Sequence, residues 1–122
     1  MSQLNLSTML GVQPELRRKF SEFEGLEAPV ILSGVLTVTS FAVNPIPEAG
    51  AADQVDSIVK AGVQAGDLLL IHVPATNTIT VDDANINLAA ATRAVAPGGS
   101  LLLVYDGTQW SEIVFVAATD NV

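Results

Sequence analysis

The chain has 122 residues, no cysteine, and 13 acidic against five basic side chains, which gives a formal net charge of −8 at pH 7. These values indicate one domain, exclude disulfides and cysteine–zinc sites, and argue against binding to a nucleic-acid backbone. No uninterrupted apolar run approaches the ~20 residues of a membrane-spanning helix. The first ten residues lack the basic and apolar regions of a signal peptide, so neither a membrane segment nor a cleaved leader is expected.

The apolar content is high for a soluble domain. Hydrophobic residues make up 49% of the chain but aromatic residues only 5%, and the mean hydropathy is +0.45. A domain of this size buries only about two-thirds of the surface that its unfolded chain exposes. We therefore expect the surplus apolar side chains to be buried between copies of the chain, because obligate interfaces resemble a domain core cut in half.

The first 34 residues differ from the rest and predict an N-terminal arm. The basic run 17–19 holds three of the five basic residues, so the remainder of the chain is acidic. Pro14 suits the first position of a helix, and Gly25 suits a helix end. Apolar side chains recur between them at helical spacing, at Leu16, Phe20 and Phe23. The arm is therefore expected to carry a short helix.

Two interpretations of this arm stay open. In the first, the helix packs on its own domain. In the second, it docks on another protein, with Phe20 and Phe23 as apolar anchors and the basic run facing an acidic partner. The second interpretation divides the chain into a docking arm, residues 1–34, and a β-rich body that trimerises, residues 35–122.

The first half of the body mixes strand and loop signals. Residues 30–43 predict strands, interrupted by Gly34, because β-branched residues alternate with other side chains there. Two prolines within 44–50 predict a loop. The following stretch is ambiguous, since a helix over 51–60 and a strand over 56–60 fit it about equally well.

From residue 62 onward, short strands alternate with turns, as in a small all-β fold. Three apolar runs predict strands, at 66–73, 78–88 and 99–113. Clusters of Gly, Pro, Asn and Asp predict turns, at 64–67, 74–77, 82–85, 96–99 and 106–108. Residues 88–95 are expected to form an irregular connector. The first and last runs share the form glycine, polar residue, four apolar residues, so each is expected to open one layer of a stacked β-structure.

Strict alternation predicts which side chains line the inner face of the body. The residues in question are Leu68, Leu70, Ile79, Val81, Ile86, Leu88, Leu102 and Val104. Where a run is continuously apolar, the intervening positions should be buried as well, against another sheet or subunit. Together with Trp110, these residues are the expected trimer core.

Residue types that carry catalysis or bind metals are sparse. The only histidine, His72, lies inside an apolar run and is expected to be structural rather than a general base. The polar segment 82–87 lacks the glycine and the terminal glutamate of a calcium loop, which favours turn and capping roles. No lysine follows 97–100, which argues against a phosphate-binding loop there. We therefore expect no enzyme activity, no cofactor and no metal site.

The second half of the chain resembles the β-spike segments of tailed-phage virion proteins. The likeness rests on 66–71, 77–83, 85–88 and 101–113, the last with an aspartate–glycine turn followed by Trp-Ser-Glu. Such motifs occur in head decoration proteins, tail fibres and spikes alike, and members of this group are typically homotrimers. A short chain with a distinct N-terminal segment looks most like a capsid decoration, or cement, protein.

This resemblance implies a mainly β fold, either a small β-sandwich or a stacked β-body, with an N-terminal arm, assembled as a homotrimer. It implies a protein made in the host cytoplasm that binds the major capsid protein on the outside of the virion and stabilises the shell. Neither nucleic acid nor membrane is an expected partner. The residues expected to dock on the capsid are Leu4, Leu6, Leu10, Leu16, Arg17, Arg18, Lys19, Phe20 and Phe23.

Two other readings stay open at this point. A receptor-binding or glycan-binding spike or fibre tip would use Trp110, Tyr105 and Asp106 as a sugar site, although such sites usually contain more exposed aromatic residues. A non-viral β-sandwich domain is the third reading.

Overall fold

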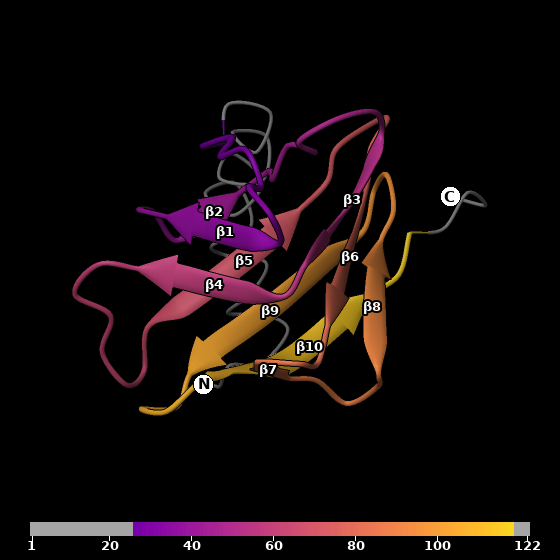
Figure 1. The fold of residues 1–122 in the computed structure, drawn as a ribbon. Helices are drawn as coiled ribbons and strands as arrows, with labels where there is room; N and C mark the ends of the chain where they lie inside the picture. Colours follow the sequence, from indigo (N-terminus) through magenta and orange to yellow (C-terminus); the bar gives the residue numbers. More distant parts are fainter. Residues whose placement is uncertain (1–25, 119–122) are drawn as a thin grey trace, which may run out of the picture.

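The computed structural model describes residues 26–118, and every regular element in that range is a β-strand. The strands are β1 (Val35–Val38), β2 (Ala42–Val43), β3 (Ala52–Val55), β4 (Ser57–Lys60), β5 (Leu68–His72), β6 (Thr78–Asp82), β7 (Ile86–Asn87), β8 (Thr92–Val95), β9 (Ser100–Tyr105) and β10 (Trp110–Val116). They form three sheets, in the orders β1-β4, β3-β6-β8 and β2-β5-β9-β10-β7 (Figure 1). The predicted mainly β character is therefore confirmed.

The first six strands form two stacked coils. β1, β2 and β3 make the first coil, and β4, β5 and β6 pair with them in parallel and in the same order. The registers begin with Val35 opposite Ser57, Ala42 opposite Leu70, and Ala52 opposite Thr78. Each strand thus meets its partner roughly 25 residues later, a spacing typical of repeat architectures such as solenoids. The body is a stacked, solenoid-like β-structure, one of the two arrangements that the sequence predicted.

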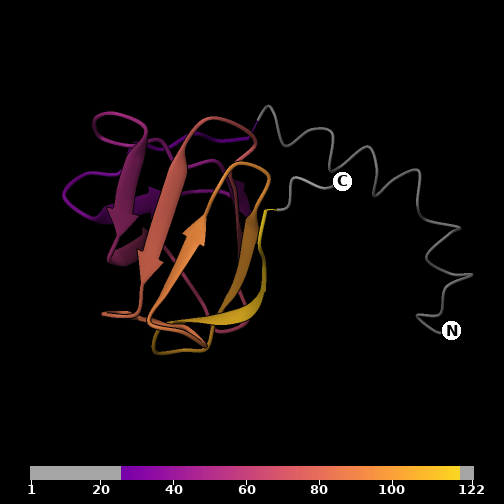
Figure 2. The same cartoon turned by 90° about the vertical axis from the view of Figure 1, so that its right-hand side faces the viewer.

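After β6 the chain reverses direction and closes the stack with antiparallel strands. β8 pairs with β6, β9 pairs with β5, and β10 pairs with β9, all antiparallel. β7 pairs in parallel with the first residues of β10. Figure 2 looks onto the three-stranded sheet, with β3, β6 and β8 facing the viewer. In the five-stranded sheet, the two outer pairs of strands, β2-β5 and β10-β7, are parallel, and the two central pairs, β5-β9 and β9-β10, are antiparallel.

Residues 26–34, which the sequence analysis assigned to the arm, lie against the body. Glu27 bridges in parallel to Val43, and the backbone N–H of Asn44 donates to the Glu27 carbonyl at 2.8 Å. Ile31 is fully buried in the core. This segment therefore extends the stack beside β2.

The turn between β9 and β10 shows how local chemistry sets the register. Gly107 has a φ of +100°, which side chains with a Cβ rarely adopt. The Asp106 carboxylate accepts backbone hydrogen bonds from Thr108 and Gln109 at 2.8 and 2.9 Å. These contacts fix the hairpin in which Trp110 pairs with Tyr105.

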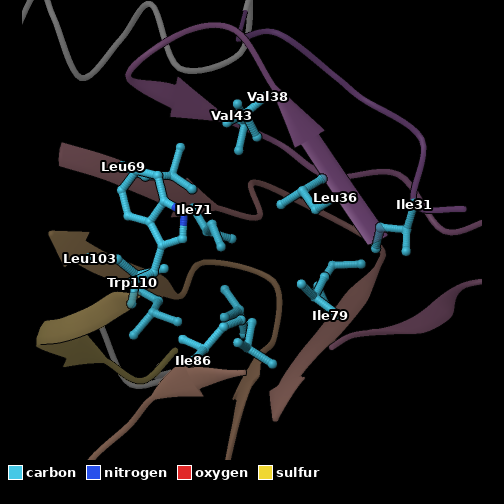
Figure 3. Close-up of a cluster of buried hydrophobic side chains, with 14 of the residues drawn as sticks. Ile31, Leu36, Val38, Val43, Leu69, Ile71, Ile79, Ile86, Leu103 and Trp110 are labelled. Carbon is cyan, nitrogen blue, oxygen red and sulfur yellow. The ribbon is translucent and has the colours of Figure 1, made fainter. Parts of the chain in front are cut away.

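A single apolar core lies between the three sheets (Figure 3). Its buried side chains come from the bridging segment, from both coils and from the closing strands. They are Ile31, Leu36, Val38, Val43, Val55, Leu69, Ile71, Val73, Ile79, Val81, Ile86, Val95, Leu101, Leu103 and Trp110. The described body thus buries a continuous core of its own, built almost entirely from aliphatic residues.

One ambiguity of local structure is resolved, and one prediction is wrong. The helix over 51–60 is not formed, because β3 and β4 occupy this stretch; the alternative strand over 56–60 matches β4. The expected irregular connector over 88–95 contains β8. β3 and β8 flank β6 on either side, so pairing within this sheet overrides their weak local preferences.

Candidate functional site

The residues expected to form the capsid-docking and trimer surfaces fall into three groups. All nine capsid-docking residues lie before residue 26, outside the described part of the chain. Ile79, Val81, Ile86 and Trp110, predicted for the trimer core, are buried within one chain. Leu88 packs against the same cluster while partly exposed. Burial inside a single copy therefore accounts for these five residues.

The third group shows that the predicted inner face of β5 and β9 is wrong by one residue. The side chains that fill the core are Leu69, Ile71, Leu101 and Leu103, each 0% exposed. The predicted ones are Leu68, Leu70, Leu102 and Val104, which lie on the opposite side of the sheet. A one-residue change of phase exchanges the two faces, because side chains alternate along a strand.

These residues belong to an apolar outer face of the five-stranded sheet. The register places Leu68 beside Val104, Leu70 beside Leu102, and Leu102 beside Val114. We define the outer face by six side chains: Leu68, Leu70, Leu102, Val104, Val114 and Val116. Leu68, Val114 and Val116 are 40%, 45% and 55% exposed. Solvated sheet faces normally carry polar side chains, so this face has the composition of a buried one.

A polar pair lies at one end of the outer face. His72 on β5 pairs with Ser100 on β9, and His72 Nδ1 lies 2.7 Å from Ser100 Oγ. Burial lowers the pKa of His72, which favours the neutral ring at pH 7. The strand positions on this side of β5 and β9 hold no carboxylate and no permanent cation. At the other end of the face, the Asp106 carboxylate accepts from Ser111 Oγ at 2.8 Å.

Both basic residues within 26–118 are engaged in ion pairs. Arg93 on β8 meets Glu112 on β10, with Nε–Oε1 and Nη2–Oε2 distances of 2.9 and 2.8 Å, and its guanidinium lies 4.8 Å from the Phe115 ring centroid. Lys60 Nζ lies 3.4 Å from Asp67 Oδ2. The bidentate Arg93–Glu112 pair ties the three-stranded sheet to the five-stranded sheet.

The outside of the body is consequently acidic. Nine of the 13 acidic residues but only two of the five basic ones lie in residues 26–118. Since both of these cations are paired, seven carboxylates have no basic partner within the described range. The basic run 17–19 lies outside that range.

Acidification is expected to weaken the link through Glu112. Hydrogen bonds from Arg93 hold the pKa of Glu112 below its usual value of 4.5. A carboxyl group with a lowered folded-state pKa stabilises the fold fully above its unfolded pKa, and this contribution is lost as the pH falls through the folded value. Glu112→Gln should therefore unfold more easily than the native chain at pH 7, and the gap should narrow below about pH 4.5.

Urea unfolding at a series of pH values, followed by circular dichroism, measures this gap. Glu48→Gln provides the control, because Glu48 is exposed and accepts only a backbone hydrogen bond from Ser33. A gap for Glu112→Gln that stays constant from pH 7 to about pH 3 would contradict the assignment.

The candidate sugar site and calcium segment have structural roles. Trp110 is 3% exposed and packs edge-to-face against Tyr105, with ring centroids 5.4 Å apart, so its ring offers no open surface to a sugar. Asp82 accepts from the Ala84 N–H and from Gln54 Nε2, at 3.0 and 2.6 Å. Within residues 26–118, no group of three or more His, Cys, Asp or Glu side chains is arranged to hold a metal ion.

Comparison with known proteins does not assign the chain to a family. No family model matches the chain, and no curated protein matches it. In the described range there is no helix of the length and apolar character needed to cross a membrane. Within residues 26–118, the two distinctive surfaces are the apolar outer face and the acidic exterior.

Proposed function

We propose that the protein is a virion structural protein: a homotrimeric capsid decoration, or cement, protein that binds the outside of the shell. The N-terminal arm docks on the major capsid protein, and the β-body projects from the capsid surface. Its role is structural, without catalysis or a cofactor. The proposal rests on the likeness of residues 62–116 to phage β-spike segments and on the charge distribution of the chain.

The division of charge is the observation that carries this proposal. The body has a continuous buried core and is acidic, and both of its described cations are held in ion pairs. The basic run lies in the segment before it, beside Phe20 and Phe23. This local cluster of basic side chains favours one orientation: residues 17–19 meet an acidic shell surface, and the acidic bodies repel one another and stay dispersed.

Stabilisation of the shell follows from linkage. A protein that binds only the assembled shell stabilises it by about 2.7 kcal/mol per site at a hundredfold excess over Kd. Three arms on one trimer engage neighbouring sites together, so their affinities combine through a high effective concentration. Individually weak arm contacts are therefore sufficient for firm decoration.

Replacing the basic run tests the docking role of the arm. The triple variant Arg17→Glu, Arg18→Glu, Lys19→Glu should lose co-sedimentation with shells assembled without this protein, because charge attraction becomes repulsion. Deleting residues 1–25 should have the same effect and leave the trimer intact. The variant Arg17→Lys, Arg18→Lys retains the charge and should still bind. Undiminished decoration by the deletion variant would show that the arm is not the docking element.

A further inference from the structure

We infer that copies of this chain meet through the outer face of the five-stranded sheet. The inference rests on the homotrimer of the proposed function and adds the surface through which the copies associate. Leu68, Leu70, Leu102 and Val104 were expected to contact other copies as part of an inner core. The structure instead puts them on a face that the rest of residues 26–118 leaves open.

The first argument is that β5 and β9 are apolar on both sides. Their inward side chains, Leu69, Ile71, Leu101 and Leu103, are completely covered by the chain's own core. Their outward side chains are four aliphatic residues and, at one end, the polar pair His72 and Ser100. Leu68 is 40% exposed and the other five are partly exposed, and β10 adds two exposed valines. Strands that are apolar on both faces are typical of sheets covered on both faces.

The second argument is that the strand positions of this face carry no charge; the Asp106 carboxylate lies only at its end, where it accepts from Ser111 Oγ at 2.8 Å. The positions that share its side of β2, β5, β9 and β10 are the six outer-face residues together with Ala42, His72, Ser100 and Ser111. None of them is acidic, although the described body contains nine carboxylates. Copies with the same negative charge can approach only where carboxylates are not brought together, so this face suits a second copy of the chain.

The area of the face sets the strength of the association. Four strands about 4.8 Å apart, each contributing about five residues at about 3.3 Å per residue, cover roughly 300 Å². Three copies around an axis would then bury roughly 900 Å², below the range of stable standard-size interfaces. The trimer in solution should therefore dissociate on dilution, and simultaneous attachment of three arms to a shell would hold it together.

Matched substitutions test this surface in the full chain. Val114→Glu and Leu68→Glu change outer-face residues that are 45% and 40% exposed, so the fold should tolerate them. Val59→Glu and Leu32→Glu introduce the same changes at residues that are 48% and 59% exposed but lie away from this face. Each of the four substitutions adds one negative charge. General repulsion between copies therefore rises equally in the outer-face variants and in the controls.

Sedimentation velocity over about 1 to about 100 µM protein is the measurement. The native chain should show concentration-dependent association, the outer-face variants should weaken it by at least about tenfold, and the control variants should change it by less than about threefold. Val114→Thr, which keeps the shape of the side chain, should give an intermediate effect. Circular dichroism should show that all variants keep the native fold.

Three outcomes would overturn the inference: a native chain that is monomeric throughout, outer-face variants that associate normally, or controls that weaken association equally. The native chain could instead be monomeric, with Val114→Glu and deletion of residues 1–25 lowering its melting temperature by the same amount. That result would show that the chain's own N-terminal segment covers the face. If the variants behave as expected but the native trimer does not bind shells, the proposed function fails while the interface stands.

Discussion

Replacing Leu103 with alanine is expected to lower the free energy of unfolding by about 2–5 kcal/mol. Leu103 lies at the centre of the five-stranded sheet, is 0% exposed, and pairs with Leu69 on one side and Glu112 on the other. Its removal would leave a cavity in a core that holds few large side chains able to move into the gap. Urea unfolding of Leu103→Ala and of the native chain at low protein concentration gives the difference directly.

The adjacent residue supplies a control of the same type. Leu102 lies on the outer face, and Leu102→Ala should cost clearly less than Leu103→Ala when copies are dissociated. The comparison therefore tests which face of β9 is inside. Equal losses for the two variants, or a larger loss for Leu102→Ala, would contradict the register described here.

Replacing Trp110 with alanine is expected to cost about 3–5 kcal/mol, an effect of at least the same size. Trp110 is 3% exposed, begins β10, pairs with Ile86 in parallel and Tyr105 antiparallel, and packs its ring against Tyr105 at an interplanar angle of 68°. Since the core is otherwise aliphatic, no other side chain replaces this volume. Thermal unfolding followed by far-ultraviolet circular dichroism is the suitable measurement, because Trp110→Ala removes the only tryptophan.

Trp110→Phe is the matched variant. It keeps an aromatic ring next to Tyr105 and should recover a large part of the loss. A Trp110→Ala protein as stable as the native chain would show that Trp110 is not part of the core, and it would reopen the interpretation of Trp110 as an exposed sugar-binding residue.

Apart from β8, the strands and turns of the second half of the body could be placed from the sequence. Glycine, proline and aspartate act locally there, as Asp106 and Gly107 do in the β9–β10 hairpin, so their effect can be read without tertiary information. The segment 51–60 stayed ambiguous and 88–95 was mispredicted, because both form strands only through pairing across the stack. Such pairing joins residues far apart in the chain.

The phase of β5 and β9 was also mispredicted, although a signal was present. A run of four apolar residues contains no alternation, so it does not indicate which side faces the core. The polar residue at one end of each run indicates the outward side. His72 shares its side with Leu68 and Leu70, and Ser100 shares its side with Leu102. The outward side of each strand is the one that also carries the polar side chain.

The Arg93–Glu112 pair had no sequence signal at all. Its two residues are far apart in the chain, and Glu112 has an 8% exposed side chain at a position that pairs with the buried Leu103. A carboxylate at an inward position contradicts simple polarity patterns. It is tolerated because Arg93 reaches it with two hydrogen bonds and a backbone N–H, from Ala89, donates a third.

Because the two coils stack in parallel, the height of the body depends on the number of coils in it. The first coil ends at Val55 and the second begins at Ser57, and each strand of one lies directly on its counterpart in the other. An added coil of roughly 25 residues between them would raise the body by one strand spacing, about 4.8 Å, and leave the antiparallel closing strands unchanged. Relatives of different length are therefore expected to differ by whole coils at this junction, and genome surveys can look for that increment.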